Sequence, residues 1–232
     1  MAINEYYLPL HYTGHRERLR KRFRDSRGKA LSDYEILELF LFFAIPYKDT
    51  KPIAKALLKA FGTFENITMA DEARLCEVRG VGPAAALALN VYGEMSLRQV
   101  RQKITQIPLL NSWDAVICYC RKSNAFKQKE TVHVLFLNKK NFLIADEVLF
   151  EGTVDQTPFY IRNIIKRALD LGAVSMILVH NHPSGDATPS ASDISETQRL
   201  YIAAKTMDIT LHDHIIVAKD KYTSLKSLGL IE

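Results

Sequence analysis

The sequence contains few cysteines and no long apolar run. The three cysteines, Cys76, Cys118 and Cys120, are an odd number without a framework spacing, which argues against a disulfide scaffold. The single residue between Cys118 and Cys120 does not match the usual zinc spacings either. No apolar run reaches the roughly 18–20 residues that a membrane span needs, and the stretch 36–46 also contains Glu38. The first twenty residues lack the order of basic and apolar segments found in a secretory signal. We therefore expect a cytoplasmic protein without a membrane span.

Charged residues are 25% of the chain and hydrophobic residues 47%, which is ordinary for a soluble protein. The 232 residues suffice for one large or two small domains. The charge is uneven, because residues 1–107 hold 17 Lys and Arg against 12 Asp and Glu, whereas residues 108–232 hold 14 of each. An acidic partner such as nucleic acid is therefore expected for the N-terminal half only.

The first hundred residues have the pattern of helices separated by glycine and proline. Ser32, followed three residues later by Glu35, predicts a capped helix start, and Pro46 ends that helix. Further helices are predicted over residues 50–61, 70–77 and 83–103. This half is expected to be an all-helical domain.

From about residue 130 the pattern changes to strands that alternate with helices, which is typical of an α/β domain. Strands are predicted over 131–137, 142–150, 173–180 and 209–217, and helices over 160–171 and 192–207. We place a linker near 101–112, so that the predicted domains are residues 1–105 and 106–232. The fold class is α+β, an all-helical domain followed by an α/β domain.

The most informative segment runs from His180 to Asp193. His180 ends an apolar strand, and residues two apart on an extended chain point to the same side, so His180 and His182 can direct their imidazoles to one point. Two turns follow, and Asp193 falls in the first turn of the next helix. Two histidines with one carboxylate are a common catalytic zinc set. The alternatives are ordinary surface or core histidines and a capping box in which Ser190 and Asp193 serve only the helix.

This segment resembles the JAMM signature of the JAB/MPN metallohydrolases, which is HxH, seven residues, Ser, two residues and Asp. The version His-Asn-His-Pro-Ser-Gly is similar to the RadC-type branch, whose members were once described as DNA repair proteins. Segments 14–19, 31–39 and 78–83 extend the resemblance over nearly the whole chain. It implies a cytidine-deaminase-like domain with a mixed sheet, one Zn²⁺ per chain on His180, His182 and Asp193, and hydrolysis of peptide or isopeptide bonds.

The resemblance also implies a glutamate at the start of an earlier strand, where it acts as the general base. Glu130 fits best because it begins the strand 131–137; Glu147 and Glu151 are competitors, and a solvated strand-end charge is the alternative for Glu130. Ser190 is expected to donate a hydrogen bond to the developing oxyanion, with helix capping as the alternative.

A second HxH, His212-Asp213-His214, has no acid at the matching distance. A structural role is expected for it, and Asp213 is a hypothetical orienting partner for a ligand histidine.

Two N-terminal features point to nucleic acid. Gly80-Val81-Gly82-Pro83 resembles the hairpin of helix-hairpin-helix modules, in which backbone amides approach a phosphate, although a tight turn between packed helices also uses two glycines. Residues 15–24 form a dense basic run that is able to contact phosphates without sequence selectivity. A solvated helix face or a contact with an acidic protein is the alternative for that run.

Two functions are consistent with the sequence. The first is a zinc-dependent peptidase or isopeptidase acting on a peptide or protein substrate, held near DNA by its N-terminal domain. The second is a nucleic-acid-binding accessory protein in DNA repair or recombination whose zinc domain is not catalytic. A zinc nuclease is weaker, because two-metal phosphodiester chemistry normally uses more carboxylates. The sequence identifies neither the substrate nor the oligomeric state.

Overall fold

A computed structural model describes residues 14–124, 127, 129–152, 161–219 and 221–231. The chain forms two compact units that divide between Met95 and Ser96. The division falls inside the long helix α6 (Pro83–Thr105). Within the described ranges, no helix is long and apolar enough to cross a membrane.

The N-terminal unit is helical, as predicted. Its elements are α1 (His15–Ser26), α2 (Asp33–Ala44), α3 (Lys51–Phe61), α4 (Phe64–Thr68), α5 (Glu72–Cys76) and the first part of α6. The predicted capping box is confirmed at α2, where the Ser32 backbone N–H donates to Glu35 Oε2 at 2.9 Å. The core of this unit is aliphatic and includes Leu37, Leu41, Leu57, Ile67 and Leu89.

The C-terminal unit contains a five-stranded sheet in the order β2-β1-β3-β4-β5. The strands are β1 (Glu130–Leu137), β2 (Leu143–Gly152), β3 (Ser175–Asn181), β4 (Thr210–Ala218) and β5 (Lys221–Ser224). Only β3 and β4 pair in parallel among these neighbours, and α9 (Ala191–Thr206) makes the crossover between them. The predicted α+β class with a C-terminal mixed sheet is therefore confirmed.

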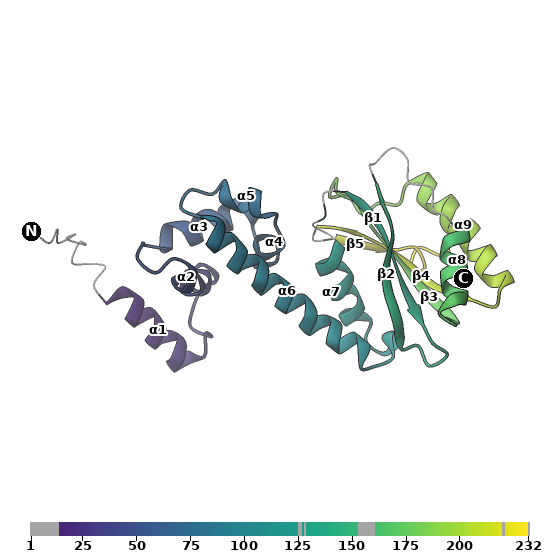
Figure 1. The fold of residues 1–232 in the computed structure, drawn as a ribbon, viewed down its shortest axis with the longest axis horizontal. Coiled ribbons are helices and arrows are strands. Elements are labelled where there is room, and N and C mark those ends of the chain that lie inside the picture. The colour runs from purple at the N-terminus through teal and green to yellow at the C-terminus, as the bar shows by residue number, and fades with distance from the viewer. Residues whose placement is uncertain (1–13, 125–126, 128, 153–160, 220, 232) are drawn as a thin grey trace, which may run out of the picture. The chain divides into compact units, whose positions relative to one another are not determined.

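Helices cover both faces of this sheet, which makes three layers (Figure 1). On one face, side chains such as Val134 and Leu178 pack against α8 (Ile161–Asp170) and α9. On the other face, Leu135 and Ile177 pack against α7 (Trp113–Asn124), the end of α6 and the short 3₁₀ helix η2 (Leu109–Asn111). Both faces of the central strands β1 and β3 are buried, which explains their continuous apolar sequences.

The structure differs from the sequence prediction at the linker. We expected one near 101–112, but α6 continues to Thr105 and η2 follows at Leu109. Ile104 and Leu109 are fully buried in the core beneath the sheet. The Gln, Pro and Asn residues that interrupt the pattern here therefore lie between anchored side chains. Helices α4 and α7 and strand β5 were not predicted.

Candidate metal centre

The structure brings His180, His182 and Asp193 together at one end of the sheet. Each offers a ligand atom, and these atoms lie within 4.8 Å of one another. Nδ1 of His180 is 3.2 Å from Oδ1 of Asp193, and Nε2 of His182 is 3.4 Å from Oδ2. The two imidazole rings meet edge to face, with centroids 4.9 Å apart.

Local chain geometry explains how the three side chains meet. His180 lies in β3, and the backbone N–H of His182 donates to Val217 O of the parallel neighbour β4 at 2.9 Å, which holds the chain in register past the end of β3. The following loop turns at Gly185, whose φ of +87° is in the region that favours glycine. Asp193 then takes the third position of α9 after the cap residue Ser190.

The orientation of His182 is fixed by a backbone carbonyl. Nδ1 of His182 lies 2.7 Å from Asp186 O, and because a carbonyl only accepts, this nitrogen carries the proton. In the neutral ring the lone pair is therefore on Nε2, which lies 3.4 Å from Asp193 Oδ2 and donates to that carboxylate when the ring is protonated. Metal-ligating histidines are typically held in this way by a partner on their second nitrogen.

A buried chain of polar groups supports the site from behind. Thr197 Oγ1 donates to Asp193 O at 2.5 Å and lies 2.7 Å from Nδ1 of His214. Since the Thr197 proton is engaged, His214 donates from Nδ1. The His214 ring stacks on His180 at 6.1 Å, and burial, together with the charge of His180, lowers the pKa of His214 to about 3. His214 is therefore a neutral packing partner of His180.

Asp213, the middle residue of the second HxH, has a structural role. The Asp213 carboxylate accepts hydrogen bonds from Ser224 Oγ at 2.5 Å and from the backbone N–H groups of His214 and Lys226 at 2.7 and 3.0 Å. These bonds join β4 to β5 and the following turn. The hypothesis that Asp213 orients a ligand histidine is therefore wrong, and for His182 the carbonyl of Asp186 does this instead.

The Asp193 carboxylate is held in its ionised form. Burial by itself raises the pKa of Asp193, but hydrogen bonds with His180, His182 and Ser190 outweigh burial and hold that pKa well below its usual range. The hydrogen bond to Asp193, against the opposing effect of burial, raises the pKa of His182. A carboxylate that is ionised at neutral pH is the form that a metal needs.

Glu130 lies at the same end of the sheet. It begins β1, which pairs antiparallel with β3 so that Val132 is opposite His180. The Glu130 and His180 side chains therefore share one face of the sheet. Oε2 of Glu130 is 3.8 Å from Nε2 of His180, and its side chain is 12% exposed, which leaves it accessible to a small molecule such as water.

The two competing glutamates have other partners. Glu147 forms a double hydrogen bond with Arg167 of α8, at 2.7 and 2.6 Å. Glu151 is exposed and lies 3.2 Å from Lys129. Of the three carboxylates, Glu130 is the one that the structure places beside His180.

Asn181 is a site residue that the sequence reasoning missed. It lies between the two histidines and points to the opposite side of the strand, where it is fully buried. Its Oδ1 accepts hydrogen bonds from the backbone N–H of Thr131 at 2.7 Å and from Thr131 Oγ1 at 2.6 Å, and its Nδ2 donates to Lys129 O at 3.0 Å. Asn181 thus holds the residues on both sides of Glu130. A polar residue inside an apolar strand was the available signal, because a buried amide needs partners.

Ser190 has the capping role that was the alternative to an oxyanion role. Its Oγ donates to Asp193 Oδ2 at 2.7 Å and accepts from the Asp193 N–H at 3.1 Å, while its own N–H donates to Oδ2 at 2.8 Å. The hydroxyl lies beside the Asp193 carboxylate, and its contribution to catalysis stays a prediction.

These residues fit a metal ion. Two imidazoles and one carboxylate converge, His180 and Asp193 are buried, and separate hydrogen bonds fix His182 and Asp193. This donor set is common in catalytic zinc sites, which keep a further position open.

Comparison with known families agrees with this geometry. Residues 110–230, more than half of the chain, match the family described as RadC-like JAB domain. The matched range contains the whole sheet, the three converging side chains and Glu130. The chain therefore belongs to the RadC-like JAB domain family.

Proposed function

We propose that the C-terminal unit is a zinc-dependent hydrolase that cleaves peptide or isopeptide amide bonds. The observation that carries this proposal is the convergence of His180, His182 and Asp193 beside Glu130. The JAB family includes metallohydrolases, which supports the reaction class. We propose further that the N-terminal unit is helix-hairpin-helix-like and that the C-terminal unit is a metallohydrolase domain with a cytidine-deaminase-like arrangement, which places their boundary at 95/96 and not at the predicted 105/106.

Each residue has a separate role in this reaction. A zinc ion on the three side chains would supply a water nucleophile at neutral pH and polarise the scissile carbonyl. Glu130 takes the proton from the attacking water and gives it to the leaving amine. Ser190 turns its hydroxyl from Asp193 to the developing oxyanion, and its backbone N–H continues to bond Asp193.

Metal content is the first test. We expect about one zinc ion per purified chain, measured by elemental mass spectrometry, because His180, His182 and Asp193 form one candidate site. His180→Ala should lose the zinc and destabilise the C-terminal unit. His212→Ala is the matched control, since His212 lies near the start of β4, away from the site, and bonds Asn141 in the turn between β1 and β2. Equal zinc in wild type and His180→Ala would contradict the assignment.

Asn181→Ala should lower turnover roughly 10- to 100-fold while zinc is retained, as is typical when a partner behind the reacting groups is removed. The substitution leaves the Thr131 N–H and hydroxyl without their acceptor and loosens the start of β1. Turnover on an amide substrate and zinc content would be measured together. Asn90→Ala is the control, because Asn90 also donates to two carbonyls, of Thr68 and Ala70, but in the N-terminal unit. Unchanged turnover in Asn181→Ala, or loss of its zinc, would contradict this role.

We also propose that the N-terminal unit binds nucleic acid weakly through the Gly80–Pro83 turn, which retains the accessory function as the second candidate. Packing explains Gly80, since its φ is +97° and an added Cβ would lie 2.8 Å from Ile53 Cδ1. Packing does not explain Gly82, because an added Cβ there meets nothing within 4 Å. Close approach of an outside group to the backbone is a reason for glycine at this position.

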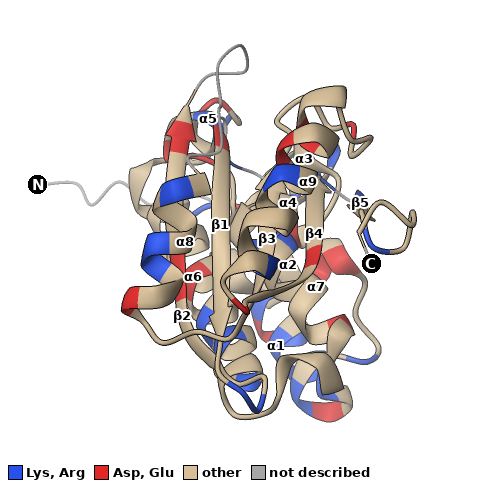
Figure 2. Ribbon diagram, turned by 90° about the vertical axis from the view of Figure 1, so that its right-hand side faces the viewer, with Lys and Arg blue, Asp and Glu red and all other residues tan. Residues whose placement is uncertain are grey.

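The basic run supports this proposal less than its sequence indicated. Arg16 donates to the carbonyls of Ile45 and Lys48, and Arg22 bonds Glu35 at 2.6 Å. Figure 2 shows acidic positions among the basic ones on α1. Several cations of the run thus serve the fold.

Duplex binding, measured by fluorescence anisotropy, should weaken several-fold between roughly 50 and 200 mM salt, because phosphate contacts release counterions. Gly82→Asp should weaken it further, whereas Ala60→Asp, the same added charge on an exposed position of α3, should have a smaller effect. Salt-insensitive binding, or none at low salt, would refute the proposal.

A further inference from the structure

The N-terminal unit has an apolar groove between α1 and α2 that the proposed hydrolase does not use. It encloses about 460 Å³ and is lined by two arginines and five apolar side chains, Arg20, Phe23, Arg24, Ile36, Leu39, Phe40 and Phe43. Phe43 is 81% exposed and Phe23 41%. A groove with walls this exposed suits a chain segment laid across it better than an enclosed small molecule.

A second hollow continues the groove. It measures about 190 Å³, shares Ile36 and Phe40 with the first, and is otherwise lined by Leu37, Phe64, Thr68, Leu89 and Tyr92. Two adjacent apolar hollows with a common wall can take two apolar side chains of one segment. Spaced apolar anchors of this kind are how amphipathic peptides bind grooves.

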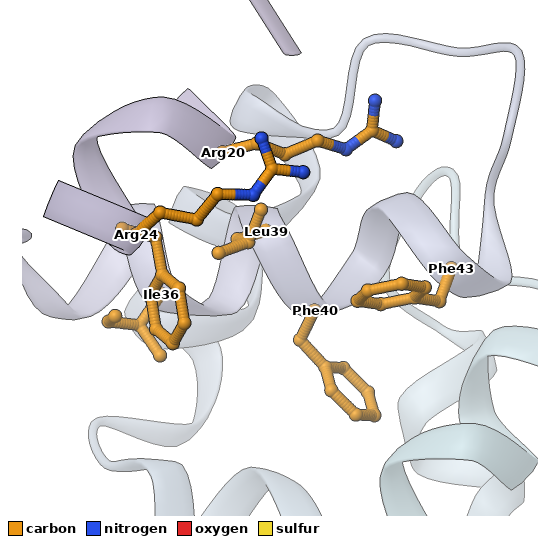
Figure 3. A pocket seen from close by; sticks show the side chains of 7 residues that line it. Arg20, Arg24, Ile36, Leu39, Phe40 and Phe43 are labelled. Atoms are coloured by element: carbon orange, nitrogen blue, oxygen red, sulfur yellow. The ribbon is translucent and has the colours of Figure 1, made fainter. Parts of the chain in front are cut away.

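The positive charge of Arg20 and Arg24 at the groove favours an acidic peptide segment. Arg20 and Arg24 are one helical turn apart on α1, and Figure 3 shows the guanidinium group of Arg24 near Leu39, whereas the Arg20 side chain extends farther from Leu39. Their nearest acidic partner is Glu17, at 3.6 Å from Arg20 and 3.2 Å from Arg24. These ion pairs are exposed, so each contributes little, and carboxylates of a partner can replace Glu17.

We propose that this groove docks a short acidic amphipathic segment of a partner protein. One or two bulky apolar side chains enter the hollows, and flanking Asp or Glu side chains bond the two guanidinium groups. A nucleic-acid strand is disfavoured here, because aliphatic and Phe side chains form the floor of the groove. Its lining includes only two cations, Arg20 and Arg24, and both lie at one edge. Through this groove the N-terminal unit would bind a partner protein independently of catalysis in the C-terminal unit.

The test is selection of random 12-residue peptides displayed on phage against the full-length chain. The enriched peptides should combine Asp or Glu with bulky apolar residues. A labelled synthetic copy of the best peptide should bind roughly 10-fold more weakly to Phe43→Ala and to the double variant Arg20→Glu, Arg24→Glu, as for residues at the centre of an interface. Tyr47→Ala, at 91% exposure, and Lys29→Glu lie outside the groove and are the matched controls, which should change affinity less than about 2-fold.

Several outcomes would overturn the proposal. One is no enrichment, and another is enrichment of basic or neutral peptides. Equal peptide affinity in the groove variants and the controls would place binding elsewhere. Competition by a thymidine oligonucleotide that depends on Phe43 would assign the groove to nucleic acid, and self-association that Phe43→Ala abolishes would assign it to a second copy.

Discussion

Glu130→Gln should keep zinc at the wild-type level and lower kcat for amide hydrolysis roughly 100- to 10,000-fold, the range expected for loss of a general base. The amide has nearly the shape of the carboxylate, so the start of β1 and its bonds to Asn181 should persist. Glutamine cannot accept the proton of the attacking water. Zinc content and single-turnover hydrolysis, measured on the same preparation, separate the two effects.

Glu151→Gln is the matched control for this prediction. Glu151 is on the adjacent strand and exposed, and its partner is Lys129, so the same chemical change there should leave kcat unaltered. If Glu130→Gln hydrolyses at the wild-type rate, Glu130 is not the base. If wild type hydrolyses nothing and nucleic-acid binding survives the substitution, the accessory function takes the place of the enzyme.

The convergence of His180, His182 and Asp193 was predictable because their relation along the chain is local. Two histidines two residues apart on a strand share a side, and Asp193 is fixed three residues after its cap residue. Both rules depend on backbone geometry alone. The fit of the whole segment to a known signature removed the alternative of unrelated histidines, although not that of capping.

The position of Glu130 depends on the pairing of strands that are far apart in sequence. Val132 is opposite His180, and one step of register would turn the Glu130 side chain to the other face. The turn lengths and periodicities in this sequence do not specify that register. Only the resemblance indicated Glu130, and only the structure revealed that Asn181 fixes its backbone.

The prediction of a linker near 101–112 was wrong for a similar reason. Ile104 and Leu109 stand among Gln, Pro and Asn, so local composition predicts an irregular connection. Ile104 and Leu109 are buried because they belong to the same core as Leu135 and Ile177, which come from strands β1 and β3. Tertiary packing thus overrides a weak local preference, as it often does.

Asp193→Asn should weaken zinc binding more than the roughly 10- to 100-fold that loss of a supporting partner costs, because it removes a charged ligand. The same carboxylate serves two purposes, since Oδ1 is near His180 and Oδ2 accepts from Ser190. Asparagine retains a carbonyl oxygen for the Ser190 N–H but has no charge. The metal-free protein should therefore lose at most the ~0.5–2 kcal/mol that a helix cap contributes.

Ser190→Ala is the counterpart that separates ligation from capping. It removes the hydroxyl that bonds Asp193 and should cost about 1 kcal/mol of stability, with zinc retained. If Asp193 served only the capping box, the two variants would be destabilised alike and would contain the same metal as wild type. If it is a ligand, metal titration followed by isothermal calorimetry distinguishes them at once, because only Asp193→Asn loses affinity. The stability of the metal-free variants, measured by urea unfolding, then shows how much of the carboxylate's contribution belongs to the helix.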